Sequence, residues 1–193
     1  MTWSTFHHRG AILQSVVETA DARRDGILPL DLPGVSETFR GELDLLAALH
    51  LKWHTRLSGN IERALMDQPL DLEGAVASAW SLTSEQLPGV RMVLDRYAES
   101  PSDQEMAAAL NRANEKEWTR LAAAAGLASD EGPAAARAGR QVELRARTHG
   151  AERRAARAAE DLLAHATTDV DTSTDLDGAT PSLVERIKAV LAA

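Results

Sequence analysis

Apolar side chains recur at steps of three and four residues along most of this 193-residue chain, and this spacing is what most constrains its fold. Such steps place side chains on one face of an α-helix, whereas a half-buried strand requires strict alternation. The pattern predicts a helix over residues 2–24 and a second of about eight turns from Ser36 to Leu65. Asp71, Pro88 and Ser102 open three further helices. We therefore predict an all-α fold, a multi-helix bundle.

The bulky apolar residues are unevenly distributed along the chain. Val, Ile, Leu, Met, Phe, Trp and Tyr number 34 in residues 1–100 and 16 in residues 101–193. Because burial of these side chains stabilises a core, the core is expected mainly in the first part of the sequence. We divide the chain into a bundle core (1–127), a long Ala/Arg-rich helix (128–166), an acidic linker (167–181) and a short C-terminal amphipathic helix (182–193).

The four tryptophans stand on four different predicted helices. They are Trp3, Trp53, Trp80 and Trp118. Tryptophan buries more apolar surface than most other side chains, and it usually finds a hydrogen-bond partner for its indole N–H when buried. We therefore expect these four residues to anchor the core.

The C-terminal segment is expected to act as a docking helix. One of its sides carries Leu183, Val184, Ile187, Val190 and Leu191. A helix of about 12 residues is marginal in water when it is alone. This helix must therefore dock on its own core, on a second copy of the chain or on another protein.

The charge pattern argues against nucleic acid as a partner, with one local exception. The formal net charge is −8, which repels polyanions on average. The exception is the Ala/Arg-rich helix, which carries Arg137, Arg140, Arg145, Arg147, Arg153, Arg154 and Arg157. Glutamates are interleaved with these arginines and no aromatic residue is available there to stack on bases. Weak nucleic-acid binding through this helix is the second alternative function.

Two histidines four residues apart are the main candidate for chemistry. His50 and His54 project from the same side of a helix, a geometry in which both can bind one zinc ion. The residue after the first histidine is Leu51, so the general-base glutamate of an H-E-x-x-H protease is missing. An antiparallel hairpin of the first two long helices would bring His7 level with the pair. The favoured interpretation is that the pair is the polar edge of a packing face and that no cofactor is bound; the alternative is that His7, His50 and His54 form a site for a divalent transition metal.

Several function classes lack their sequence signals. The chain has no cysteine, no G-x-S-x-G, no phosphate-binding loop and no G-x-G-x-x-G, so catalysis has no recognisable motif. It also has neither a signal-peptide pattern nor 18 consecutive apolar residues, so we expect a cytoplasmic protein without a membrane partner. The leading hypothesis is a non-enzymatic protein-interaction or regulatory module that associates with itself or with another protein. The first alternative is a metal-dependent or small-molecule-binding bundle that uses the three histidines.

Overall fold

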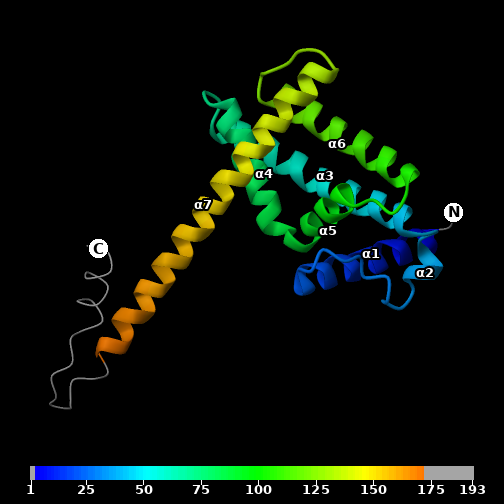
Figure 1. The fold of residues 1–193 in the computed structure, drawn as a ribbon, viewed down its shortest axis with the longest axis horizontal. Helices are drawn as coiled ribbons and strands as arrows, with labels where there is room; N and C mark the ends of the chain where they lie inside the picture. Colours follow the sequence, from blue (N-terminus) through cyan, green and yellow to red (C-terminus); the bar gives the residue numbers. More distant parts are fainter. Residues whose placement is uncertain (1–2, 172–193) are drawn as a thin grey trace. The chain divides into compact units, whose positions relative to one another are not determined.

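The computed structural model describes the fold of residues 3–171 and the side chains of residues 8–163. Within that range all regular structure is helical, which confirms the all-α, multi-helix prediction (Figure 1). The helices are α1 (Trp3–Arg23), α2 (Val35–Thr38), α3 (Glu42–Asp67), α4 (Leu72–Gln86), α5 (Pro88–Glu99), α6 (Gln104–Ala124) and α7 (Pro133–Asp171).

The chain forms two compact units that divide within α7. Residues 1–151 make up the first unit and residues 152–193 the second. The first unit therefore contains α1 to α6 and the beginning of α7, so part of the Ala/Arg-rich helix belongs with the bundle. The helix also runs to Asp171, beyond residue 167, where we predicted the acidic linker to begin.

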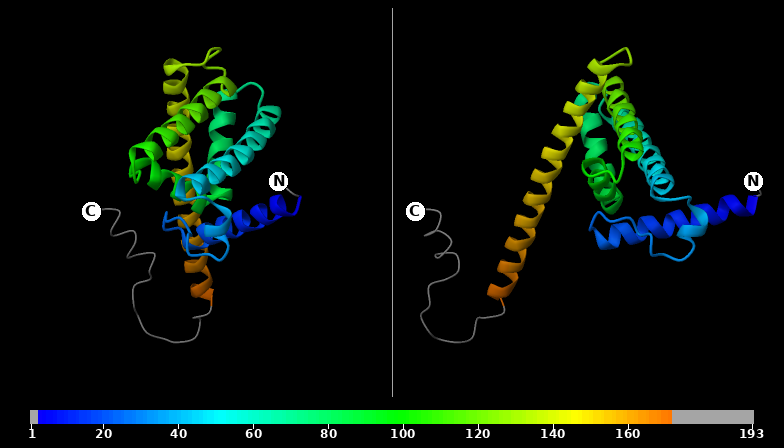
Figure 2. Two further views of the ribbon diagram at one scale, coloured as in Figure 1. Left: turned by 90° about the vertical axis from the view of Figure 1, so that its right-hand side faces the viewer. Right: turned by 45° about the vertical axis from the view of Figure 1, so that its right-hand side comes forward.

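α3 forms the centre of the bundle core. It packs against α4, α5 and α6, and the views in Figure 2 show these helices around it. Its buried face carries Leu45, Leu49, Trp53 and Leu57, each at most 1% exposed. The expected tryptophan anchors are confirmed for Trp53 and Trp80 in α4, which is 2% exposed. Trp118 in α6 is half-buried, and the side chain of Trp3 lies outside the described residues.

α1 does not form the antiparallel hairpin with α3 that we predicted. It packs mainly against α5, and Figure 2 shows it lying across α3 rather than alongside it. At the α1–α5 crossing, Gly89 lies so close to the backbone of Ala20 that a Cβ atom would collide with it. The backbone N–H of Gly89 also donates to Asp21 of α1, at 2.8 Å. A glycine that allows close backbone approach thus gives α1 a different partner.

Two predicted helix starts are wrong, the one at Ser36 by several residues and the one at Ser102 by one, while a third is confirmed. Ser36 lies inside the one-turn helix α2 instead of opening the long helix, because the buried Phe39 takes an extended conformation and interrupts it. Ser102 does not cap α6; the carboxylate of Asp103 accepts from the N–H of Met106 at 2.8 Å. Asp71 caps α4, as predicted.

The first part of α7 is held tightly against the bundle. A Cβ atom at Gly139 would collide with the backbone of Trp118, so the missing side chain permits close packing of α7 on α6. Val142 and Ala146 are fully or almost fully buried, and the Ser81 hydroxyl of α4 donates to the Ala146 carbonyl at 2.7 Å. The scarcity of bulky apolar residues in this segment is therefore offset by small residues that let helices approach.

Candidate functional site

The two histidines lie on the buried side of α3 together with a tryptophan. His50, Trp53 and His54 are spaced by three and four residues, so they share one helix face. His50 is 6% exposed, Trp53 is fully buried and His54 is half-buried. The two imidazole rings are stacked, with their centroids 6.0 Å apart. This face turns toward α6, since Trp53 donates to Glu117 of that helix.

Glu117 places a carboxylate at a core position of α6. It is 2% exposed and falls on the helix face that also carries the buried Leu110 and Leu121. A buried carboxylate is costly unless its oxygens accept hydrogen bonds. Trp53 Nε1 donates to both oxygens and Trp80 Nε1 donates to Oε1, all at 3.1 Å. Two indole rings from two helices therefore hold this carboxylate in one orientation.

His50, His54 and Glu117 converge on one point. One nitrogen from each imidazole and one oxygen of the carboxylate lie within 4.8 Å of one another. His54 Nε2 lies 3.9 Å from Glu117 Oε2, which is too long for a hydrogen bond. The ligand atoms of a tetrahedral zinc ion lie about 3.4 Å apart, given metal–ligand distances of about 2.1 Å. Small side-chain rotations would therefore bring these three groups to bonding distance of one ion.

Arg91 of α5 is a buried cation behind this cluster. It is 6% exposed, and its guanidinium lies 4.9 Å from the ring centroid of Trp53 and 5.9 Å from that of Trp80. Its Nη2 donates to Asp95 at 2.8 Å, and its Nη1 lies 3.8 Å from Glu117. Arg91 is thus bound more closely to Asp95 than to the carboxylate of the cluster.

A chain of ion pairs continues from Arg91 to α7. Arg147 makes a two-pronged contact with Asp95, at 2.7 and 2.9 Å, and also donates to Glu143. Glu143 accepts from the indole N–H of Trp118. We call this set the acid–arginine network, and its charged members are Arg91, Asp95, Glu117, Glu143 and Arg147. The network contains three carboxylates and two guanidiniums, so its formal charge is −1.

Burial keeps both histidines neutral. It lowers the pKa of His50 to about 3, and the charge of Arg91 and the neighbouring His54 act in the same direction. Burial also lowers the pKa of His54; Glu117 opposes this change, while Arg120 and Arg91 add to it. Neutral imidazole is the form that binds metals. The Nδ1 atoms of both rings are buried and have no hydrogen-bond partner among the described residues.

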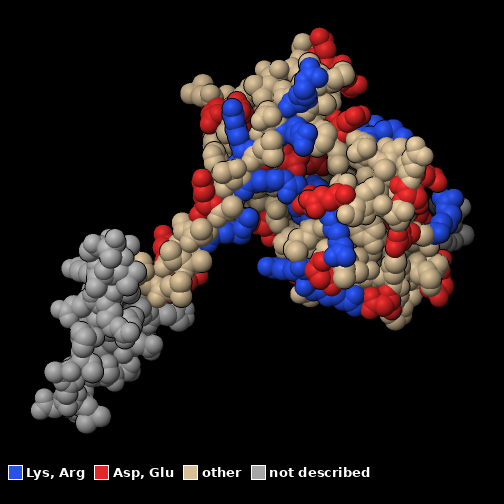
Figure 3. Space-filling view, in the orientation of Figure 1, with Lys and Arg blue, Asp and Glu red and all other residues tan. Residues whose placement is uncertain are grey.

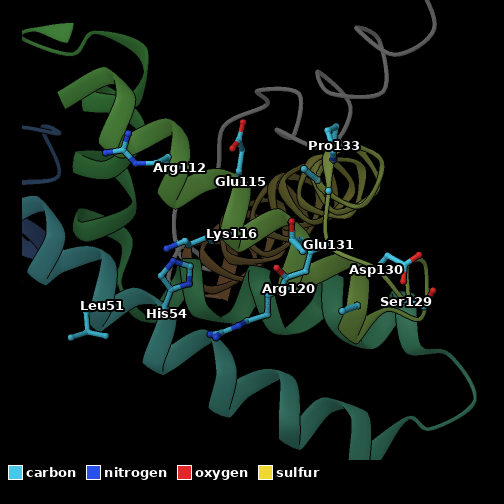
Figure 4. Close-up of a pocket in the computed structure, with 14 residues that line it drawn as sticks. Leu51, His54, Arg112, Glu115, Lys116, Arg120, Ser129, Asp130, Glu131 and Pro133 are labelled. Atoms are coloured by element: carbon cyan, nitrogen blue, oxygen red, sulfur yellow. The ribbon is translucent and has the colours of Figure 1, made fainter. Parts of the chain in front are cut away.

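A groove of about 1050 Å³ opens beside His54 (Figure 4). Its walls come from α3, α6 and the loop that leads into α7. Apolar atoms of Leu51 and Ala123 line it together with polar side chains. Its charged residues are Arg112, Glu115, Lys116, Arg120, Asp130 and Glu131. Because His54 belongs to both the groove and the cluster, the cluster lies directly behind the groove wall.

The structure brings together two of the three histidines that we singled out. His7 belongs to α1, but its side chain lies outside the described residues, so its part in the site stays a prediction. The third group near His50 and His54 is Glu117, which we did not predict. The available signal was its position seven residues after Leu110, on the apolar face of the helix.

The residues of the predicted docking helix, at 183–191, also lie outside the described range.

Three arginines of the predicted basic helix contact the bundle. Arg145 pairs with Glu73 of α4, Arg147 belongs to the acid–arginine network, and the Arg140 guanidinium lies 5.6 Å from the ring centroid of Trp118. On the face drawn in Figure 3, basic and acidic side chains are interspersed. These arginines therefore stabilise the packing of α7 as well as carrying charge.

The structure and the comparisons give no direct sign of a known activity. In the range covered by the described residues, no helix is long and apolar enough to cross a membrane. No protein-family model, curated protein or solved structure matches this chain, so the chemistry of the site is inferred from its own residues.

Proposed function

We propose that this helical bundle binds a divalent transition metal, such as Zn²⁺, through His50, His54 and Glu117. The observation that carries the proposal is the convergence of two neutral imidazoles and one carboxylate within 4.8 Å in a buried position. Two histidines and one glutamate are a donor set that catalytic zinc sites use. This is the metal-dependent alternative that the sequence indicated, with Glu117 as a ligand that the sequence did not.

The charge around the cluster supports a cation there. The acid–arginine network carries a formal charge of −1, and neither neighbouring imidazole compensates it. A buried uncompensated charge is costly, and bound metal ions are a common way to offset one. Two cations weaken this attraction. Arg91 Nη1 is 3.8 Å from Glu117, although its closer partner is Asp95. The charge of Arg120, in addition to burial, lowers the pKa of His54.

The tryptophans would act as the outer shell of such a site. Groups that hydrogen-bond to a metal-binding carboxylate fix its orientation and tune its affinity for the ion. Trp53 and Trp80 occupy this position, because both donate to Glu117. Among the described residues Oε2 accepts only from Trp53, and a carboxylate oxygen can accept a second bond. Glu117 could therefore bind an ion without losing both indole hydrogen bonds.

Three protein ligands would leave the fourth position of a tetrahedral ion open. Structural zinc sites are normally closed by four protein ligands, whereas sites that bind a substrate or water keep one position free. Because His54 also lines the groove, that position is expected on the groove side. The proposed function is thus a ligand-binding or catalytic metal centre rather than a structural one.

Metal titration of the full chain tests the proposal. Protein produced without an oligohistidine tag would be treated with a chelator, and Co²⁺ binding would be followed by visible absorption with Zn²⁺ as competitor. We expect one Co²⁺ ion to bind per chain. The Co²⁺ affinity of His54→Ala should be about 100-fold weaker, because one metal ligand is lost. His54 is half-buried, so this change should leave the helical circular dichroism spectrum unaltered.

The matched control is His8→Ala. His8 is exposed on α1 and does not belong to the group formed by His50, His54 and Glu117, so its loss should leave the Co²⁺ affinity unchanged. Equal affinities of the wild type and His54→Ala, or no binding by the wild type, would contradict the proposal. The cluster would then be a polar part of the core that only positions α3 against α6.

The other two functions stay predictions. The interaction module depends on a helix outside the described residues. Nucleic-acid binding depends on an arginine helix of which part is engaged with the bundle. No contact in the described part of the chain favours either over the metal site.

A further inference from the structure

We infer that the groove beside His54 binds a small molecule through a carboxylate or phosphate group, held by Lys116 and Arg120 next to the metal. This inference rests on the proposed metal-binding function and names the class of ligand that would fill the open position.

Lys116 and Arg120 place two cations beside the cluster. They are four residues apart on α6, on either side of Glu117, and both line the groove. Figure 4 shows their side chains on the side of the groove where His54 lies. An anion at this end of the groove would meet two basic side chains and the metal-binding imidazole together.

These cations are available to a ligand. Among the described residues, neither Lys116 nor Arg120 takes part in an ion pair with a carboxylate. Arg120 donates to the hydroxyl of Ser58 at 3.2 Å, a neutral partner that holds the guanidinium beside α3. Glu115 lines the same groove, but its carboxylate points away from His54 in Figure 4. Guanidinium and ammonium groups are the usual partners of carboxylate and phosphate oxygens.

The remaining charges of the groove limit the ligand to a small molecule. Asp130 and Glu131, from the loop between α6 and α7, also line the groove, and in Figure 4 Asp130 lies farther from His54 than Glu131 does. A polyanion such as a nucleic acid would bring further phosphates against these carboxylates, and the chain carries a net charge of −8. A ligand with one oxyanion needs room only at the end formed by Lys116, Arg120 and His54. The groove volume of about 1050 Å³ is ample for a metabolite-sized molecule.

Anion titration of the Co²⁺-loaded full chain tests the inference. Acetate and inorganic phosphate are the two probes, because they separate the carboxylate from the phosphate as the preferred group. Binding at the open position changes the visible absorption of Co²⁺. We expect saturation by at least one probe, and about tenfold weaker binding in Lys116→Ala and in Arg120→Ala, since a charge-assisted hydrogen bond is lost. The Co²⁺ affinity should not fall in either variant, because neither side chain is a metal ligand and each carries a positive charge.

Lys52→Ala is the matched control. Lys52 belongs to α3 and lines a separate, smaller hollow of about 320 Å³, so its removal changes the net charge equally without touching the groove. It should shift the affinity for either probe less than about twofold. Anion binding that is equally strong in Lys116→Ala, Arg120→Ala and Lys52→Ala would overturn the inference, as would a spectrum that neither probe changes.

The two proposals fail in distinguishable ways. If Co²⁺ binds but no anion perturbs it, the metal site stands and the ligand inference is wrong. If Co²⁺ does not bind, the metal site is wrong. Calorimetry of the metal-free chain with the same two probes then tests whether the groove binds an oxyanion. If the metal-free wild type binds a probe and Lys116→Ala and Arg120→Ala do not, the groove is an oxyanion site without a metal. If the metal-free wild type binds neither probe, the oxyanion site is also wrong.

Discussion

Replacement of Glu117 by leucine tests whether the buried carboxylate stabilises the bundle. Leucine has a similar volume, so the change creates little cavity, but it removes the acceptor for the indole N–H groups of Trp53 and Trp80. An unsatisfied buried donor costs about 1–3 kcal/mol, and two donors are affected. The added apolar contact and the removal of one negative charge from the acid–arginine network offset part of this loss. We expect Glu117→Leu to lower the free energy of unfolding by about 3 kcal/mol.

The measurement is urea denaturation of the metal-free protein, followed by far-UV circular dichroism because tryptophan fluorescence itself depends on this contact. Glu117→Gln retains an acceptor oxygen and should lose only about 1–2 kcal/mol. Glu115→Gln, an exposed carboxylate two residues earlier, should change stability by less than about 0.5 kcal/mol. Since buried charged groups can often be replaced by apolar ones without loss, a leucine variant as stable as the wild type is a real alternative. That result would refute the structural role assigned here to the carboxylate.

Three further predictions concern packing and pH. Trp53→Ala should cost about 3–5 kcal/mol in a thermal or urea melt, because the ring is fully buried; an unchanged melt would contradict its role as an anchor. Gly139→Ala should be destabilising because its Cβ collides with the α6 backbone, whereas Gly10→Ala, with open space around it, should stabilise by up to about 1 kcal/mol. Burial would raise the pKa of Asp95, but its hydrogen bonds with Arg147 and the nearby guanidiniums lower it overall. This contribution to stability is therefore present above about pH 4 and is lost as the pH falls further, so Asp95→Asn should flatten the acid limb of a stability–pH curve.

The helices themselves could be predicted from local sequence. Periods of three and four residues identify helix faces because the geometry of one turn is fixed at 3.6 residues, whatever the rest of the chain does. Asp71 was recognised as a cap for the same reason, since its partner is only three residues away. His50 and His54 were likewise found as a pair within one helix. Two helix starts were predicted wrongly for different reasons: Asp103 rather than the neighbouring Ser102 caps α6, and the extended Phe39 interrupts the helix that Ser36 was expected to open.

The partners of these faces were decided by tertiary structure alone. Trp53 and Glu117 are 64 residues apart, and no local spacing relates them. The predicted hairpin placed α1 beside α3, but Gly89 lets the backbone of α5 approach α1 more closely. Helix faces of similar apolar character can pair in several ways, and the choice depends on which pair packs without voids or collisions. The sequence by itself thus determined the helices and the histidine pair, whereas close backbone packing and long-range hydrogen bonds decided that a buried carboxylate would stand beside that pair.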